Sequence, residues 1–308
     1  PVNYAVALGR DFTPATIIAD APITFRLPGQ EPYSPTNYDN HFHGLVNLRT
    51  ALGSSLNVPA VKVLASYGVD QMFQMGKKLG INTWDDPSRF GLSLTLGSGE
   101  VTMLDLATVY GTFANLGRRK DLNPIIEVSD QEGKVLYQKE EAEGEQVLSS
   151  GIAFLINDIL ADDEARSIAF GRHSLLEIPQ AKVAVKTGTT NNLRDNWAVG
   201  YTPQFLVAVW VGNNDNKPMS RIASGITGAT PIWRRLTDHL LEMYPQTGWP
   251  IPEEVVRIEI CSSLGTLSCS TCPFRRWEYF LKNNLPQKSC DDSDFQPTGT
   301  ASKKGEIL

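Results

Sequence analysis

The sequence predicts a mixed α/β (α+β) domain in which helices flank an antiparallel β-sheet, followed by a small Cys-containing segment. Three strand-like segments joined by short connections predict neighbouring antiparallel strands: 182–186, 196–201 and 205–211. Four segments with apolar residues at helical spacing predict the flanking helices: 59–79, 101–116, 149–161 and 231–244.

Residues 1–50 are rich in Pro, Asn and Tyr, and they predict a long surface segment with turns after a helical start. In the helix expected over 59–79, Pro59 fits the first turn and Gly80 fits the end. Gly117 ends the helix expected over 101–116.

Turn and strand signals organise the middle of the chain. Segments 125–128 and 134–137 flank an Asp-Gln-Glu-Gly turn and predict a hairpin. Ser149 or Ser150 can cap the helix expected over 149–161. Segment 182–186 alternates polar and apolar residues, as a half-buried strand does, whereas 205–211 is apolar on both faces and predicts an interior strand.

The composition is that of a globular protein, with 41% hydrophobic and 20% charged residues among 308. The net charge is −6 and no run of Lys or Arg forms a stripe, so a nucleic-acid partner is excluded. The longest apolar run, 205–211, is too short to cross a bilayer. The chain starts at Pro1 inside a helical pattern, and we therefore expect the natural protein to continue upstream.

The composition of the sequence changes after residue 245, where Pro, Cys and Ser become frequent. We expect a main domain over 1–247, a Cys-containing extension over 248–290 and a disordered tail over 291–308. The clustered cysteines predict a local disulfide staple, with free thiols or a metal site as alternatives: Cys261, Cys269, Cys272 and Cys290. No second C-x-x-C or nearby His pair completes a zinc site.

The first chemical motif is Lys186-Thr187-Gly188-Thr189, at the end of the alternating strand. Lys186 supplies a positive charge, and the hydroxyls of Thr187 and Thr189 suit a carboxylate. Gly188 has no side chain, so a ligand backbone can approach closely and bind as an added strand. The alternative is a strand end that simply runs into a turn.

The second motif is Ser55-Leu56-Asn57, just before Pro59. Residues i and i+2 do not share a helix face, so Ser55 and Asn57 can act together only from the loop before the helix. Pro59 supports this, because it disfavours helical geometry at Val58. The alternative is that one of the two residues caps the helix.

Weaker candidates have structural explanations. The pair His41 and His43 could bind metal, but no carboxylate or Cys cluster supports this, and a loop role is favoured. Arg194 and Asp195 are expected to make turn or strand-end contacts. We expect two tryptophans, Trp197 and Trp210, in the core.

Taken together, the two motifs belong to the signature set of penicillin-binding proteins and serine β-lactamases. The chain resembles the class A, bifunctional penicillin-binding proteins from residue 1 to about residue 245. The similar stretches are 33–39, 43–44, 48–49, 54–61, 96–100, 186–190, 194–197 and 200–203. The resemblance implies a penicillin-binding protein and β-lactamase-like fold, a peptidoglycan D,D-transpeptidase activity and no cofactor.

The resemblance also assigns roles. Ser55 would relay a proton in concert with Lys186, and Asn57 would hydrogen-bond the substrate backbone. Thr187 and Thr189 would hold the terminal carboxylate, with the Thr189 N–H as an oxyanion donor. The partners would be D-Ala-D-Ala stem peptides and β-lactams, at the outer face of a bacterial membrane with an anchor upstream.

One departure from the family concerns the nucleophile. The family uses S-x-x-K, yet no serine in this chain has Lys three positions later. Residues 1–8 and 12–14 resemble the segment that comes directly after this motif in the family, so we expect the motif itself on an upstream segment immediately before Pro1. Two alternatives remain open: a serine β-lactamase, or a non-catalytic domain that binds β-lactams or wall peptides.

Overall fold

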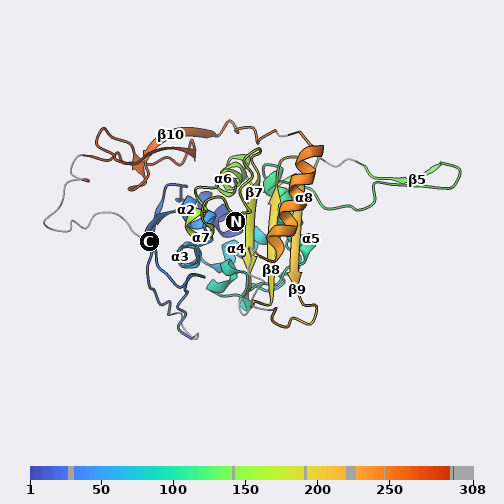
Figure 1. The fold of residues 1–308 in the computed structure, drawn as a ribbon, viewed down its shortest axis with the longest axis horizontal. Helices are drawn as coiled ribbons and strands as arrows, with labels where there is room; N and C mark the ends of the chain where they lie inside the picture. The colour runs from blue at the N-terminus through green and yellow to red at the C-terminus, as the bar shows by residue number, and fades with distance from the viewer. Residues whose placement is uncertain are drawn as a thin grey trace.

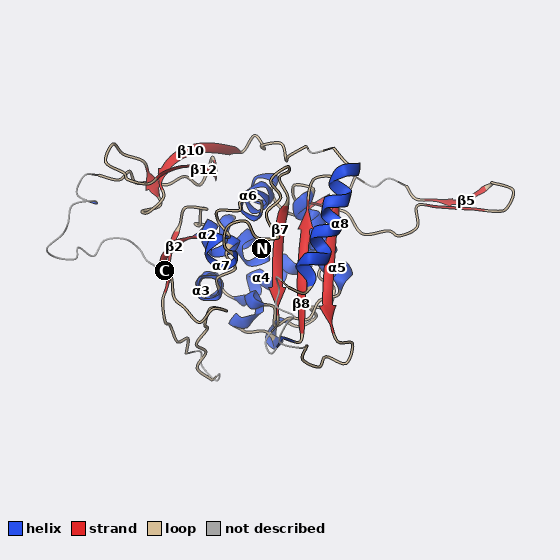
Figure 2. Cartoon of the chain, in the orientation of Figure 1, coloured by secondary structure: helices blue, strands red, loops and turns tan. Residues whose placement is uncertain are grey.

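The computed structural model describes residues 1–26, 31–140, 143–190, 193–219, 227–245, 247–291 and 294. At its centre three antiparallel strands form a sheet in the order β7 (Ala184–Thr189), β8 (Asp195–Tyr201) and β9 (Leu206–Gly212). These strands confirm the three that the sequence predicts. Figure 2 shows the sheet with helices on both sides, which confirms the expected fold class.

The two faces of this sheet pack against different helices. Helix α8 (Ala229–Met243) covers one face, and α5 (Met103–Ala114) with α6 (Ser150–Leu160) covers the other (Figure 1). Successive strand residues alternate between the two packed layers. The α8 layer contains Val185, Ala198, Val207 and Val209, and the opposite layer contains Ala184, Val199 and Tyr201.

Strand β9 corrects one expectation. In the described part of the chain its strand partner is β8 alone, so it lies at an edge of the sheet and is not interior. Its sequence is apolar on both faces because α8 contacts one face and α5 the other. The apolar residues on both faces of β9 are therefore explained by the two helices that cover it, and they do not indicate a strand partner at each edge.

Four helices build the layer beside the sheet: α1 (Val2–Leu8), α2 (Leu48–Gly53), α3 (Asn57–Tyr67) and α4 (Val69–Leu79). Helix α1 confirms the expected helical start, and all 7 of its residues are buried. The expectation of a surface segment over 1–50 is wrong in part, because Phe12, Ile18 and Leu48 are also buried in the core. Helix α1 is mostly apolar and packs against α3, α4 and α6, and the amide of its buried Asn3 donates to the Ala60 carbonyl on α3 at 2.8 Å.

The single helix expected over 59–79 is two helices, α3 and α4. Gly68 separates them with φ of +91°, a value that glycine adopts without the steric cost of a side chain. Both helices bury apolar residues in the same core, so the helical spacing runs on across the break.

Short elements complete the main domain. Three antiparallel pairs are β1 (Ile17–Asp20) with β2 (Gly44–Asn47), β3 (Arg118–Arg119) with β6 (Glu145–Gln146), and β4 (Glu127–Ser129) with β5 (Val135–Gln138). The last pair confirms the expected hairpin, which projects from the body (Figure 1). Three short helices are η1 (Pro87–Arg89), η2 (Leu92–Leu96) and α7 (Ser167–Phe170). Among the described helices, none has the length and apolar character needed to cross a membrane.

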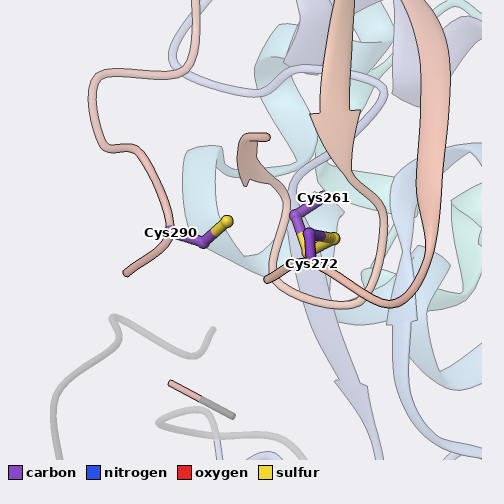
Figure 3. Close-up of side chains that lie close together, drawn as sticks. All are labelled: Cys261, Cys272 and Cys290. Carbon is purple, nitrogen blue, oxygen red and sulfur yellow. A yellow bond between two sulfur atoms is a disulfide. The ribbon is translucent and has the colours of Figure 1, made fainter. Parts of the chain in front are cut away.

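The C-terminal segment forms its own sheet in the order β11 (Thr266–Leu267), β10 (Val255–Cys261) and β12 (Arg275–Leu281). Disulfides join Cys261 to Cys272 and Cys269 to Cys290, which confirms the expected staple. Figure 3 shows the first bond with Cys290 beside it. The tail expected to be disordered, 291–308, lies outside the described residues apart from positions 291 and 294.

A buried ion cluster ties this segment to the main domain. The side chain of Arg49 on α2 is 2% exposed, and its Nε donates to the Glu278 Oε2 on β12 at 2.7 Å. Its other nitrogens lie 2.6 Å from Asp158 Oδ2 and 3.1 Å from Asp162 Oδ2. Burial alone would lower the pKa of Arg49. The negative charges of Glu278, Asp158 and Asp162 outweigh this effect and raise the pKa above its ordinary value.

Candidate active site

The two sequence motifs meet in space. The Nζ of Lys186 on β7 donates to Ser55 Oγ at 2.6 Å, and it also donates to the carbonyl oxygen of Thr187 at 2.6 Å. Lys186 and Ser55 are 131 positions apart in the sequence. The structure therefore brings together the residues that the sequence singled out separately.

These residues border a cleft between the edge of β7 and the start of α3. Its outer part encloses about 540 Å³ and is lined by Ser55, Asn57, Thr187, Gly188 and Thr189, among others. An inner part of about 300 Å³ shares these five residues and adds Lys186 and Pro1. All six candidate residues thus line one cleft.

Ser55 is held in an unusual backbone conformation. Its φ of +56° lies in the left-handed region, which is rare for a residue with a side chain. The preceding residue, Ser54, is buried and donates its Oγ to the Ala165 carbonyl at 2.8 Å. The turn after α2 therefore presents Ser55 to Lys186.

The position of Asn57 corrects the expectation that it lies in the loop before the helix, and it tests the alternative that Ser55 or Asn57 caps the helix. It is the first residue of α3 and does not lie in the loop before it, although Ser55 does. The N-cap position is Leu56, which makes no side-chain capping bond, so neither Ser55 nor Asn57 caps α3. The capping alternative for these two residues is therefore wrong.

Strand β7 offers an open edge to the cleft, because β8 is its partner on one side and no described strand pairs with the other. Glycine at position 188 is not required by the fold. Its φ is not left-handed, and an added Cβ would meet only Trp197, at 3.7 Å, an ordinary contact distance. The missing side chain instead keeps space free beside the strand edge.

Several cleft residues were missed or misjudged from the sequence. Trp197, expected in the core, is only half-buried and lines the inner cleft, with its ring centroid 6.4 Å from that of Trp210, which is also half-buried. Tyr33 and Tyr38 line the outer cleft. The sequence contained one indication for these tyrosines, because both lie in 33–39, a stretch that resembles the class A penicillin-binding proteins.

The remaining candidates make local contacts. His43 Nδ1 lies 2.8 Å from Asp20 Oδ2, in agreement with a loop role. Arg194 lines the outer cleft and donates to the Asn216 carbonyl at 3.1 Å. Asp195 N–H donates to Thr190 Oγ1 at 3.0 Å, the expected strand-end contact. Among the described residues, one group of three metal-ligand side chains lies close together, and it consists of the disulfide-bonded cysteines at 261, 272 and 290.

The surroundings of Lys186 predict a pH dependence for ligand binding. Burial, and secondarily the charge of Arg166, lowers the pKa of Lys186 to about 8. The ammonium is present below this pH and is lost as the pH rises through it. The resemblance to the penicillin-binding proteins implies acylation by β-lactams, and we expect the rate of this acylation by a carboxylate-bearing β-lactam to fall between pH 7 and 9, measured on the protein expressed from its complete gene.

The Lys186→Arg variant is the control for this pH profile, because a guanidinium keeps its charge throughout the range. The acylation rate of this variant should be lower than that of the wild type, but it should not decrease as the pH rises through the Lys186 pKa of about 8. A wild-type rate that rises through this pH would mean that neutral Lys186 acts as a base.

Comparison with known proteins agrees with this geometry. Residues 1–238 match the family described as the penicillin binding protein transpeptidase domain. The chain belongs to this transpeptidase family. Residues 251–294 match a second family, described as the C-terminal domain of penicillin-binding protein 1A.

Individual relatives support the assignment to the penicillin-binding proteins. Penicillin-binding protein 1A of Neisseria meningitidis is 32% identical over 96% of the chain, and that of Aquifex aeolicus is 33% identical over 95%. The chain spans 36% and 39% of these two proteins. The crystal structure of penicillin-binding protein 1A from Haemophilus influenzae has a TM-score of 0.83 at 24% identity, over 94% of this chain and 48% of that one. PonA1 of Mycobacterium tuberculosis in complex with penicillin V has a TM-score of 0.67 at 24% identity, over 82% of this chain and 70% of that one.

Proposed function

We propose that this domain forms the D,D-transpeptidase site of a peptidoglycan cross-linking enzyme and that β-lactams inhibit it. The observation that carries the proposal is the 2.6 Å contact between Lys186 Nζ and Ser55 Oγ in a cleft that also contains Asn57. A lysine with its pKa lowered to about 8, hydrogen-bonded to a hydroxyl, can relay a proton near neutral pH.

The reaction would be acyl transfer in two steps. A serine oxygen would bond to the carbonyl carbon of the penultimate D-Ala, and the peptide bond to the last D-Ala would break. The serine proton would pass to the departing amine through Ser55 and Lys186. An amine of a neighbouring strand would then take the acyl group and release the serine.

Binding would use the open edge of β7. The stem peptide would lie along this edge as an added strand, close to Gly188. Its terminal carboxylate would meet the hydroxyls of Thr187 and Thr189 and the charge of Lys186. The Asn57 side chain would hydrogen-bond the peptide backbone.

The position of Pro1 supports an upstream source for the serine. Pro1 lines the inner cleft together with Ser55 and Lys186. A residue that precedes Pro1 would stand beside these two side chains. We propose that the S-x-x-K motif lies on a segment immediately upstream.

The disulfides support an extracytoplasmic location. Disulfide bonds persist in oxidising compartments and are rare in the cytosol. The pairs Cys261–Cys272 and Cys269–Cys290 thus agree with a domain that works outside the membrane on cell-wall peptides. We propose that an upstream segment anchors it there.

The test is the intact mass of the protein expressed from its complete gene, with and without penicillin. We expect a stable adduct of one penicillin per chain, on a peptide that precedes Pro1. An adduct that forms and disappears within seconds would favour a β-lactamase. The absence of any adduct would contradict the transpeptidase proposal and leave a non-catalytic binding domain.

A further inference from the structure

Helix α3, which begins at Asn57, does not supply its own N-terminal cap. The N–H groups of its first turn have no partners within the helix. A Ser, Thr, Asp or Asn at the N-cap position would normally accept one of them, but this position is the buried Leu56. The start of the helix, which carries a candidate active-site residue, must therefore be held from elsewhere.

Asn37 supplies this cap from 20 positions upstream. Its Oδ1 accepts the N–H of Asn57 at 2.9 Å and the N–H of Val58 at 3.2 Å. The neighbouring carbonyl of Thr36 accepts the side-chain Nδ2 of Asn57 at 2.8 Å. Both the backbone and the side chain of Asn57 are thus fixed by the 36–37 segment.

Asp20 fixes the orientation of the Asn37 amide. The Nδ2 of Asn37 donates to Asp20 Oδ1 at 2.9 Å and to Oδ2 at 2.8 Å. Asp20 is 0% exposed, and its Oδ2 also accepts the backbone N–H of His43 at 2.9 Å. A flipped Asn37 amide would set its oxygen against this carboxylate, so the oxygen is forced to face α3.

We propose that Asn37, oriented by Asp20, is a positioning residue that sets the geometry of Ser55 and Asn57 for acylation. Ser55 lies two residues before Asn57 and has a left-handed φ of +56°, a conformation that persists only where the surroundings hold it. Asn37 is itself only 3% exposed. It acts on the reaction through the helix start and does not contact the substrate.

The proposal rests on the proposed acylation and is tested on the protein from the complete gene with a chromogenic β-lactam. The Asn37→Ala and Asp20→Asn variants should each lower the first-order acylation constant by roughly 10- to 100-fold, because small misplacements of reacting groups are that costly. The rate is expressed per folded molecule, counted by circular dichroism at a temperature well below unfolding. The apparent affinity of the initial complex should change much less.

The double variant Asp20→Asn/Asn37→Asp distinguishes positioning from a general loss of packing. It exchanges donor and acceptor between the two positions, so the amide introduced at position 20 donates to the carboxylate introduced at position 37, whose other oxygen still caps α3. The oxygen that replaces Asn37 Nδ2 also faces the His41 carbonyl, to which Nδ2 donates at 2.8 Å, so the rescue is partial. We expect the double variant to acylate roughly threefold faster, or more, than either single variant, which recovers part of the loss that misplacement causes.

A matched control removes a helix cap at Ser149, which is not among the residues that line the cleft. Ser149 caps α6 and accepts the Ile152 N–H at 3.3 Å, so Ser149→Ala should lower the melting temperature without slowing acylation per folded molecule. A wild-type acylation constant in Asn37→Ala, or an unrescued double variant, would overturn the positioning role. If the wild type itself forms no adduct, it is the proposed function that fails.

Discussion

Replacing Gly188 by valine is expected to slow β-lactam acylation by roughly 100-fold while the domain stays folded. The side chain would project beside Trp197 on the cleft side of β7, where a ligand added to the strand edge must pass. Stability should change by less than about 1 kcal/mol, since valine suits a strand and its Cβ has room. The measurements are the acylation rate and the unfolding midpoint in urea.

Gly200, on the neighbouring strand β8, provides the matched control. A Cβ there would lie 2.3 Å from the side chain of Trp233, a fully buried residue of α8. Gly200→Ala should therefore cost about 1–3 kcal/mol or more by overpacking, whereas Gly188→Ala should be nearly neutral. If Gly188→Val acylates at the wild-type rate, the edge of β7 is not the path of the ligand.

The strands and most helices could be predicted from the sequence because their signals are local. The segments 182–186 and 101–116 show the period-2 and helical spacing of a strand and a helix. The sequence predicted a half-buried strand at 182–186, and this was wrong: Ala184 and Val185 are buried in opposite layers, so both faces are covered. The break at Gly68 was missed because both α3 and α4 face the same core, so the apolar spacing carries on. The edge position of β9 was missed because coverage by helices and pairing by strands leave the same apolar pattern.

The site residues were named from motif order, but their geometry depends on long-range contacts that no local pattern records. The approach of Lys186 to Ser55 crosses 131 positions. The cap on α3 comes from Asn37, and a search for capping residues next to the helix points wrongly to Ser55 or Asn57. Trp197 was assigned to the core because a strand tryptophan is usually buried, whereas here the strand borders the cleft.

The largest expected effect on stability is at Glu278, in the C-terminal segment. Glu278→Gln should lower the free energy of unfolding by about 3 kcal/mol, because it removes a buried partner of a buried charge. The Arg49 and Glu278 side chains are each 2% exposed, so water cannot replace the lost carboxylate. Asp158 and Asp162 still neutralise part of the charge, which limits the loss. Urea unfolding of the complete protein measures it.

The control for Glu278 is an exposed pair on the same sheet. Arg275 Nη1 lies 3.9 Å from Glu259 Oε2, with side chains 45% and 34% exposed, so Arg275→Gln should cost less than about 1 kcal/mol. Equal losses in both variants would mean that burial does not strengthen the Arg49 cluster. Because α2 carries Arg49 and ends at the turn that presents Ser55, a selective loss at Glu278 would also show that the C-terminal segment supports the helix beside the cleft.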